Sequence, residues 1–319
     1  MRIELLDLIQ CPICSSQNLE INVVDENDVE IRKGSIICLD CHAKYIIQSG
    51  IPNLLVNPSK EILDEQEGWT QLEKAVSNTD ELMLSLPDAY GDHQKSWQGQ
   101  AENFHTIWSK IQLTGNERVL DLGSGRCWST RFFSKEGCYA VGLDILLTKY
   151  VGLLTSDIYI QNEKTYFERI LGDMNDMPFR QGVFDIVFVA ASLHHSSRIH
   201  KTIRLIKHVL KPGGKLIVVN EPVVSIFGNR EVKCPEVEHG VNEHVLWLWE
   251  YLLALRFAGF RYRLYPFIGS YQNFIDQKNQ KILVNYPSLA SKYSMIPPLL
   301  YAQLYFFGGI LNLIAEIPE

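Results

Sequence analysis

The chain has 319 residues, 46% of them hydrophobic, and its formal net charge at pH 7 is −7. This length allows a large core domain and a smaller one, and the acidic balance disfavours nucleic-acid binding, which needs a surplus of Lys and Arg to neutralise phosphates. The first residues, MRIELLDLIQCPIC, lack the basic start and long apolar run of a signal peptide, so we expect a cytoplasmic protein.

Two Cys-x-x-Cys pairs lie near the start of the chain, with residues 15–37 between them: Cys11 with Cys14, and Cys38 with Cys41. Each pair directs two thiolates to one point, and two such turns beside strand-like runs at 19–24 and 34–38 predict a tetrahedral zinc site. Four thiolates close the coordination shell, so this zinc is expected to be structural. His42 is an alternative ligand, but four cysteines already complete the set.

The pattern CPIC…CLDC…KYIIQSGIPNLL, over about residues 5–57, resembles the small zinc-ribbon domain that serves as the activator subunit of tRNA and release-factor methyltransferases. The same domain is fused in front of some bacterial methyltransferases. Residues 1–57 hold four Lys or Arg against eight Asp or Glu, which disfavours an RNA clamp. We therefore predict a zinc-ribbon domain over 1–57, followed by a helical linker over 58–102 that covers the cofactor.

Apolar strands alternate with amphipathic segments from residue 103 onward. The predicted helices and strands are a helix at 103–113, a strand at 117–123, a helix at 129–137, strands at 138–145 and 182–191, a helix at 198–210 and a strand at 215–222. Uniformly apolar strands alternating with helices imply a parallel sheet covered on both faces. The expected fold is therefore an α/β, doubly wound, Rossmann-like domain over 103–270, with its ligand at the carboxyl ends of the strands.

The first strand of this domain ends at Asp121 and leads into a turn with Gly123 and Gly125. Asp144 ends the next strand, where a carboxylate can accept hydrogen bonds from ribose hydroxyls. These features alone permit NAD. However, Trp128 stands where a pyrophosphate-binding turn has its third glycine, and it leaves little room for a diphosphate. The sequence thus favours a nucleoside cofactor without phosphates.

The segments VLDLGSG, VGLDI, LGDMNDMPF, FDIVFVAASLHH and VLKPGGKLIVVNEP, over about 103–222, resemble the ordered motifs of class I S-adenosylmethionine-dependent methyltransferases. The resemblance implies S-adenosylmethionine as cofactor, with the glycine turn at its methionine part, the acid after the second strand at its ribose, and the next loop at its adenine. The implied cofactor-binding residues are Asp121, Gly123, Ser124, Gly125, Asp144, Ile145, Asp173, Met174 and Ala190. Cys127 departs from the family's usual glycine, but it is small, so the site is expected to be intact.

Methyl transfer needs the nucleophile aligned with the methyl group and, for some acceptors, a base to remove a proton. The candidates for a base or a substrate contact are His194, His195, Glu221, His239 and His244. The alternative for the two histidines after the fourth strand is a structural role. Around His239 and His244 the alternative is a helix start, with Asn242 as the cap and Glu243 in the first turn. Tyr90 and Trp97 are further candidates to cover the cofactor or to pack.

The C-terminal third continues with a helix over 245–260, which Gly259 ends, and a strand over 261–269, after an insert at 223–242. The extension 271–319 contains an uncharged stretch at 296–315 that we expect to be a helix of about 20 residues. A buried helix or substrate lid, a peripheral membrane or oligomer contact, and a bilayer span are the alternatives for it.

Three functions are compatible with these features. The first is a methyltransferase that acts on a small-molecule or lipid-linked acceptor, favoured by the acidic surface and the apolar C-terminal part. The second is a ribosomal or transfer RNA methyltransferase with the ribbon as its RNA-recognition module. The third is a scaffold without catalysis, disfavoured because both cofactor acids, Asp144 and Asp173, are present.

Overall fold

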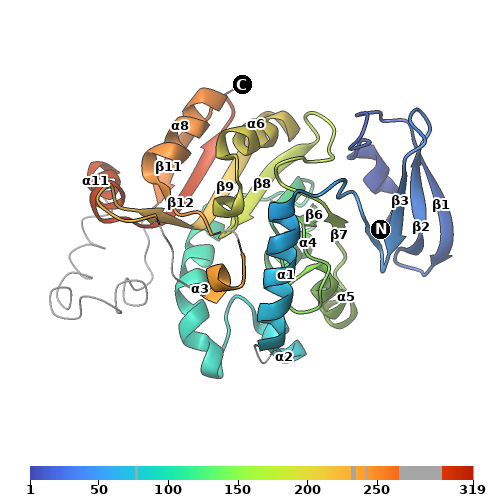
Figure 1. Ribbon diagram of the computed structural model, residues 1–319, viewed down its shortest axis with the longest axis horizontal. Helices are drawn as coiled ribbons and strands as arrows, with labels where there is room; N and C mark the ends of the chain where they lie inside the picture. Colours follow the sequence, from blue (N-terminus) through green and yellow to red (C-terminus); the bar gives the residue numbers. More distant parts are fainter. Residues whose placement is uncertain (76–77, 231–234, 242, 266–296, 319) are drawn as a thin grey trace.

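The computed structural model describes residues 1–75, 78–230, 235–241, 243–265 and 297–318. Within these residues the strands form a four-stranded sheet near the N-terminus and an eight-stranded mixed sheet with helices on both faces (Figure 1). The predicted Rossmann-like α/β fold behind a small N-terminal domain is confirmed.

The N-terminal domain is an antiparallel sheet with strand order β1-β2-β3-β4. Its strands are β1 (Leu19–Glu26), β2 (Ile31–Cys38), β3 (Lys44–Gln48) and β4 (Ile51–Pro52), preceded by a 3-10 turn at Ile3–Asp7. Leu5, Leu8, Ile36 and Ile47 are buried, and they belong to an apolar cluster that continues into the large domain with Phe179. The domain's own share of this core is small, and domains of this size usually need a metal or disulfides.

The N-terminal domain lies against β7 (Glu168–Leu171), the last strand at one edge of the large sheet. The backbone N–H of Leu54 donates to the carbonyl of Leu171 over 2.9 Å. At the same junction, the carboxylate of Glu30 lies 2.6 Å from the guanidinium of Arg169, and both side chains are buried. The two domains therefore share a junction that combines backbone pairing, a buried ion pair and apolar contacts.

The large sheet has the order β11-β12-β9-β8-β5-β6-β7. Its strands are β5 (Arg118–Leu122), β6 (Tyr139–Asp144), β7, β8 (Phe184–Ala190), β9 (Leu210–Val224), β11 (Arg261–Tyr265) and β12 (Gly309–Glu316), and β10 (Leu246–Trp247) pairs with β9. β5 to β9 pair in parallel, whereas β12 runs antiparallel to both of its neighbours. The carboxyl ends of the parallel strands consequently meet at one edge, as predicted.

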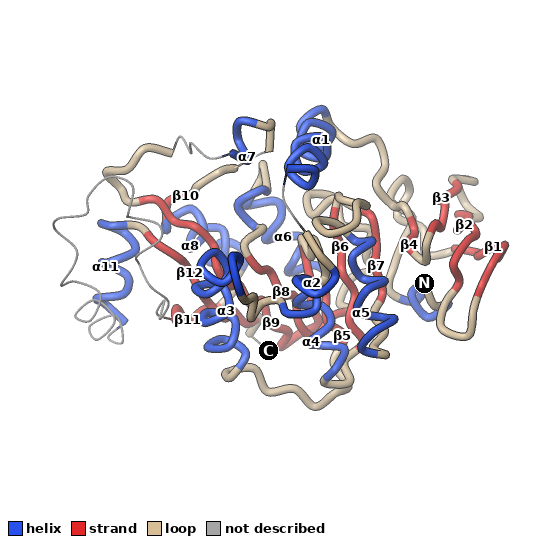
Figure 2. The backbone as a smooth tube through the Cα atoms, turned by 90° about the horizontal axis from the view of Figure 1, so that it is seen from below, coloured by secondary structure: helices blue, strands red, loops and turns tan. Residues whose placement is uncertain are grey.

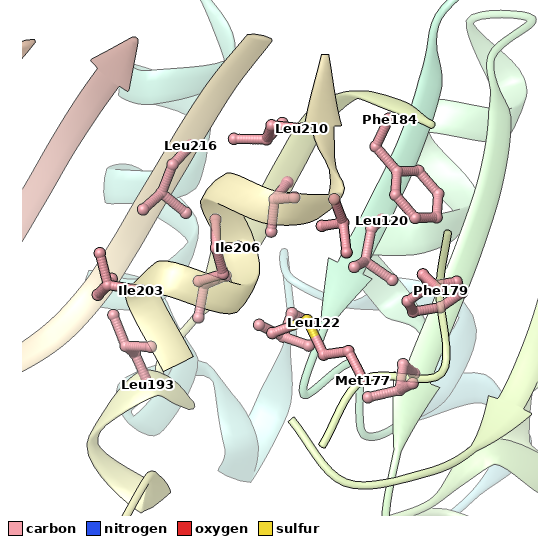
Figure 3. Packing of buried hydrophobic residues seen from close by; sticks show 14 of the residues in the cluster. Leu120, Leu122, Met177, Phe179, Phe184, Leu193, Ile203, Ile206, Leu210 and Leu216 are labelled. Carbon is pink, nitrogen blue, oxygen red and sulfur yellow. The ribbon is translucent and has the colours of Figure 1, made fainter. Parts of the chain in front are cut away.

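Helices cover the sheet and the strand ends (Figure 2). They are α1 (Lys60–Ala75), α2 (Asp80–Ser85), α3 (Gln94–Trp108), α4 (Trp128–Lys135), α5 (Ser156–Glu163), α6 (Ile199–Val209), α7 (Pro235–Glu238), α8 (Leu248–Ala258) and α11 (Pro297–Phe307). Figure 3 shows Ile203 and Ile206 of α6 facing the same apolar cluster as Leu122 of β5 and Leu216 of β9. The predicted apolar face of this helix is thus buried on the sheet.

The prediction of one helix over 296–315 is wrong for its second half. Helix α11 ends at Phe307, Gly308 adopts a left-handed φ of +71°, and residues from Gly309 form β12 between β9 and β11. A Cβ at Gly308 would lie 2.6 Å from the carbonyl oxygen of Val223, so the turn requires glycine. An uncharged apolar run reads alike as a buried helix or a buried strand, which explains the error.

The described helices include none with the length and apolar character needed to cross a bilayer. The helix start expected near residue 243 is also absent, because α8 begins at Leu248 with a capping arrangement of Trp247 and Glu250. Asn242 and residues 266–296 lie outside the described residues.

Candidate cofactor site and cysteine cluster

A cavity of about 370 Å³ opens at the carboxyl ends of β5, β6 and β8, beneath helices α1 and α3. Eight of the nine predicted cofactor residues line it: Gly123, Ser124, Gly125, Asp144, Ile145, Asp173, Met174 and Ala190. Trp69 from α1 and Trp97 from α3 form part of its wall. The linker helices therefore contribute to the pocket, whereas Tyr90 does not line it and is 62% exposed.

The glycine turn after β5 is held by backbone hydrogen bonds from Gly123 and Ser124 to the carbonyl of Leu143. Gly123 has a φ of +67°, and a Cβ there would lie 2.5 Å from the hydroxyl of Ser192, so no larger residue fits. Cys127 has a left-handed φ of +59°, a conformation that costs a non-glycine residue about 1–2 kcal/mol. The sequence did not reveal this strain, because the small size of cysteine was the only ground for expecting an intact site.

The thiol of Cys127 is fully buried and lies 3.6 Å from the hydroxyl of Ser124. Burial raises the pKa of Cys127 to about 12. The thiolate form is therefore scarce near neutral pH, and a packing role fits this cysteine better than a redox role.

Asp144 is the acid that faces the cavity at the end of β6. Its Oδ2 accepts the N–H of Gly125 over 2.7 Å, and its Oδ1 accepts the N–H of Leu146 over 2.8 Å. Burial raises the pKa of Asp144 to about 6, against the lowering effect of these two backbone donors. The carboxylate is thus fixed in orientation, and each oxygen retains a lone pair for a further donor.

Asp121 does not line the cavity, unlike the other predicted cofactor residues. Its Oδ2 accepts hydrogen bonds from Ser129 Oγ over 2.7 Å and Thr130 Oγ1 over 2.6 Å, at the start of α4. Burial raises its pKa to about 6. Asp121 therefore ties the end of β5 to α4 from behind the turn.

The loop after β7 carries Asp173, whose Oδ1 accepts both the backbone N–H and the side-chain amide of Asn175, over 2.7 and 2.9 Å. This local turn fixes the loop across the cavity from the glycine turn. Trp128 also lines the cavity and packs edge to face on Trp97, with ring centroids 6.0 Å apart. The bulky indole of Trp128 thus occupies part of the cavity wall next to the glycine turn.

His194 and Glu221 form a buried pair next to the cavity. His194 Nδ1 lies 2.9 Å from Glu221 Oε2, and its Nε2 lies 3.1 Å from Glu243 Oε2. Glu221 also accepts the backbone N–H groups of Ser192, Leu193 and His194. Burial by itself would lower the pKa of His194, but the two carboxylates outweigh it and raise this pKa to about 10. Neither His194 nor Glu221 lines the cavity.

His195 is the one of the five catalytic candidates that lines the cavity. Its Nδ1 lies 3.1 Å from Glu65 Oε1 on α1, and its Nε2 lies 3.9 Å from Glu243 Oε1. His239 and His244 are exposed and do not line the cavity. Sequence reasoning missed Glu65 altogether and assigned Glu243 to a helix start, because no local pattern links either glutamate to His195.

The four predicted metal-ligand cysteines come together at one end of the N-terminal sheet, and none forms a disulfide. The sulfurs of Cys11 and Cys41 are 3.5 Å apart, and those of Cys14 and Cys38 are 3.6 Å apart. A tetrahedral zinc with bonds of about 2.3 Å needs sulfurs about 3.8 Å apart. The cluster therefore fits a four-thiolate zinc site, and His42 is not part of it within the described residues.

Fold and pocket together define a class I, Rossmann-like methyltransferase architecture. Residues 120–218 match the family model described as a methyltransferase domain. Residues 120–218 are thus similar to a methyltransferase domain, as the sequence motifs indicated.

Among curated proteins, the chain is 27% identical over 129 residues to the demethylmenaquinone methyltransferase of Corynebacterium glutamicum, covering 38% of this chain and 52% of that protein. It is 30% identical over 125 residues to an uncharacterized methyltransferase of Synechocystis, covering 38% of this chain and 56% of the other. The chain therefore spans about half the length of the curated relatives it matches.

Two solved structures resemble the whole fold. The cyclase SpnF has a TM-score of 0.54 at 20% identity, covering 85% of this chain and 99% of that one. The second is a geranyl diphosphate C-methyltransferase from Streptomyces coelicolor, solved with Mg2+, geranyl diphosphate and S-adenosyl-L-homocysteine. It has a TM-score of 0.53 at 13% identity, covering 83% of this chain and 100% of that one. These likenesses support the fold, and the cyclase illustrates that the fold alone does not fix the reaction.

Proposed function

We propose that this protein is an S-adenosylmethionine-dependent methyltransferase whose acceptor is a small molecule or a lipid-like metabolite. The observation that carries the proposal is the cavity itself, in which a fixed carboxylate, Asp144, faces a glycine turn, Gly123–Gly125, at the strand ends. The relatives named demethylmenaquinone methyltransferases support this acceptor class, because a quinone is a small molecule.

In this proposal Asp144 accepts hydrogen bonds from the ribose hydroxyls, and Asp173 and Met174 flank the adenine. The glycine turn and Ala190 accommodate the methionine part, because each allows close approach of the backbone. S-adenosylmethionine supplies the methyl group when bound. His195 is the candidate group for contact with the acceptor, since it lines the cavity beside Ser192 and Glu65.

We further propose that Cys11, Cys14, Cys38 and Cys41 hold a structural zinc ion. Their sulfur separations of 3.5 and 3.6 Å support four-thiolate coordination, and the small core of this domain needs such a stabilising ion. Four thiolates leave no open position for substrate, so the zinc takes no part in methyl transfer.

An RNA acceptor is not favoured, because the chain carries a net charge of −7 and residues 1–57 are acidic. Peripheral membrane contact through the C-terminal segment stays a proposal. It is supported by the exposure of Phe227, Phe306 and Phe307, two of which stack with centroids 6.5 Å apart. Exposed apolar side chains such as Phe can be buried at the boundary between lipid headgroups and acyl chains.

The test is transfer of a labelled methyl group from S-adenosylmethionine into an extract of cells that lack the gene. The extract is then separated into RNA, protein, solvent-extractable and small polar fractions. Label in the solvent-extractable or small polar fraction with the wild-type protein, and its loss with Asp144→Ala, is the expected result. Nuclease-sensitive label would replace the proposal with an RNA acceptor.

A further inference from the structure

Two histidines converge on one carboxylate at the wall of the cavity. Nε2 of His194 lies 3.1 Å from Glu243 Oε2, and Nε2 of His195 lies 3.9 Å from Glu243 Oε1. The ring centroids of the two histidines are 4.3 Å apart, and one ligand atom from each of the three residues fits within 4.8 Å. Consecutive residues in a 3-10 turn, Leu193–His195, thus present both Nε2 atoms to one point.

The other ring nitrogen of each histidine faces a second, buried carboxylate. Nδ1 of His194 lies 2.9 Å from Glu221, and Nδ1 of His195 lies 3.1 Å from Glu65. Glu221 is 0% exposed, and Glu65 is 4% exposed. Metal-ligating histidines almost always donate their second N–H to such a carboxylate or carbonyl, which orients the ring and leaves the first nitrogen free to bind the ion.

The charges in this cluster also favour a bound cation. The cluster places three carboxylates, Glu65, Glu221 and Glu243, around two imidazoles in a largely buried volume. Buried carboxylates are costly unless cations compensate them. Protonated imidazoles offer one source of positive charge. A divalent ion offers another, and it also accounts for the convergence of both Nε2 atoms on Glu243.

We propose that His194, His195 and Glu243 bind a divalent first-row transition metal ion, with Glu221 and Glu65 orienting the two imidazoles. Two imidazoles and one carboxylate suit zinc, iron or cobalt better than magnesium or calcium, which prefer oxygen ligands. Three protein ligands leave coordination positions open. Because His195 and Glu65 line the cavity, these positions face the space beside the glycine turn.

The role of this ion in methyl transfer rests on the proposed function, and it narrows the class of acceptor. An ion there would take an oxygen atom of the acceptor, so the acceptor class narrows to compounds with a hydroxyl or carbonyl oxygen near the atom to be methylated. The ion would hold that oxygen in place, which is the main requirement of an in-line transfer. The binding of the ion itself requires neither cofactor nor acceptor.

The experiment is a titration with Co(II) of the full chain, whose cysteine cluster has first been filled with one equivalent of zinc. We expect one equivalent of cobalt to bind, with weak visible bands and without sulfur-to-cobalt charge-transfer absorption. Glu243→Gln and His195→Gln should abolish this signal. Glu65→Gln should weaken binding about 10–100-fold, as expected for a residue that orients a ligand.

The matched controls are Glu67→Gln, on the exposed side of α1, and His208→Gln, exposed on α6. Both should bind cobalt like the wild type, and thermal melting should verify that all variants fold. Failure of the zinc-loaded protein to bind one equivalent of cobalt, or binding that survives both Glu243→Gln and His195→Gln, overturns the metal site. Either result leaves the proposed methyl transfer standing, because the two are measured separately.

Discussion

Replacing Asp144 by alanine tests the assignment of the cofactor pocket most directly. The carboxylate is held by two backbone N–H groups, from Gly125 and Leu146, so its free lone pairs are pre-oriented toward the cavity. If it accepts both ribose hydroxyls, its loss removes two charge-assisted hydrogen bonds of about 1.5–3 kcal/mol each. The affinity for S-adenosylmethionine should then fall by about 10²–10⁴-fold.

Isothermal calorimetry with S-adenosylmethionine or S-adenosylhomocysteine measures this loss. Asp185→Ala is the matched control, because Asp185 also accepts a backbone N–H, from Arg118, but lies near the start of β8, away from the cavity. Its affinity should equal that of the wild type. Unchanged affinity in a folded Asp144→Ala protein would refute the assignment of this acid to the ribose.

Three further predictions concern pH, metal and the domain junction. The pKa of Asp144 is raised from 3.8 to about 6, so this acid stabilises the ligand-free fold below about pH 4, and the effect is lost as pH rises through about 6. Cofactor binding should depend on pH in the opposite direction, because the ribose hydroxyls prefer the ionised carboxylate. Calorimetry should therefore find weaker binding as pH falls through about 6. Cys38→Ser should remove the bound zinc and lower the melting temperature, whereas Cys138→Ser, outside the cluster, should retain the zinc by elemental analysis. Glu30→Ala removes the carboxylate that pairs with the buried guanidinium of Arg169 and should lower the free energy of unfolding in urea by about 3–5 kcal/mol. Glu26→Ala, exposed on β1, should change it little, and an equal effect of the two would contradict the importance of the junction.

Local sequence patterns were sufficient to predict which residues meet at the cavity, since eight of the nine proposed cofactor residues line it. Most of these residues lie at the end of an apolar strand or directly after it, as Asp144 ends β6 and Ala190 ends β8, and parallel strands bring such positions together without further information. The grouping of the four cysteines could also be predicted, because each Cys-x-x-Cys turn sets the spacing of its own two thiols.

What escaped prediction depends on contacts between distant segments. Glu65 is on a helix that reads as a polar linker, and it meets His195 only after α1 packs over the strand ends. The pairing of Glu30 with Arg169 joins two domains and has no local pattern either. β12 was missed for a different reason: a strand between two others, buried on both faces, loses the alternation that distinguishes strands from helices.

The N-terminal domain also changes what the large sheet presents to other molecules. β7 is an end strand, and an end strand with free N–H and C=O groups is a template for pairing with another chain. Here Asn53 and Leu54 pair with Leu171, and Arg2 donates its backbone N–H to the carboxylate of Glu168, so the N-terminal domain covers part of this edge. Release of this domain would expose unpaired backbone groups of β7. If the proposed zinc holds the domain together, we expect metal removal to cause aggregation.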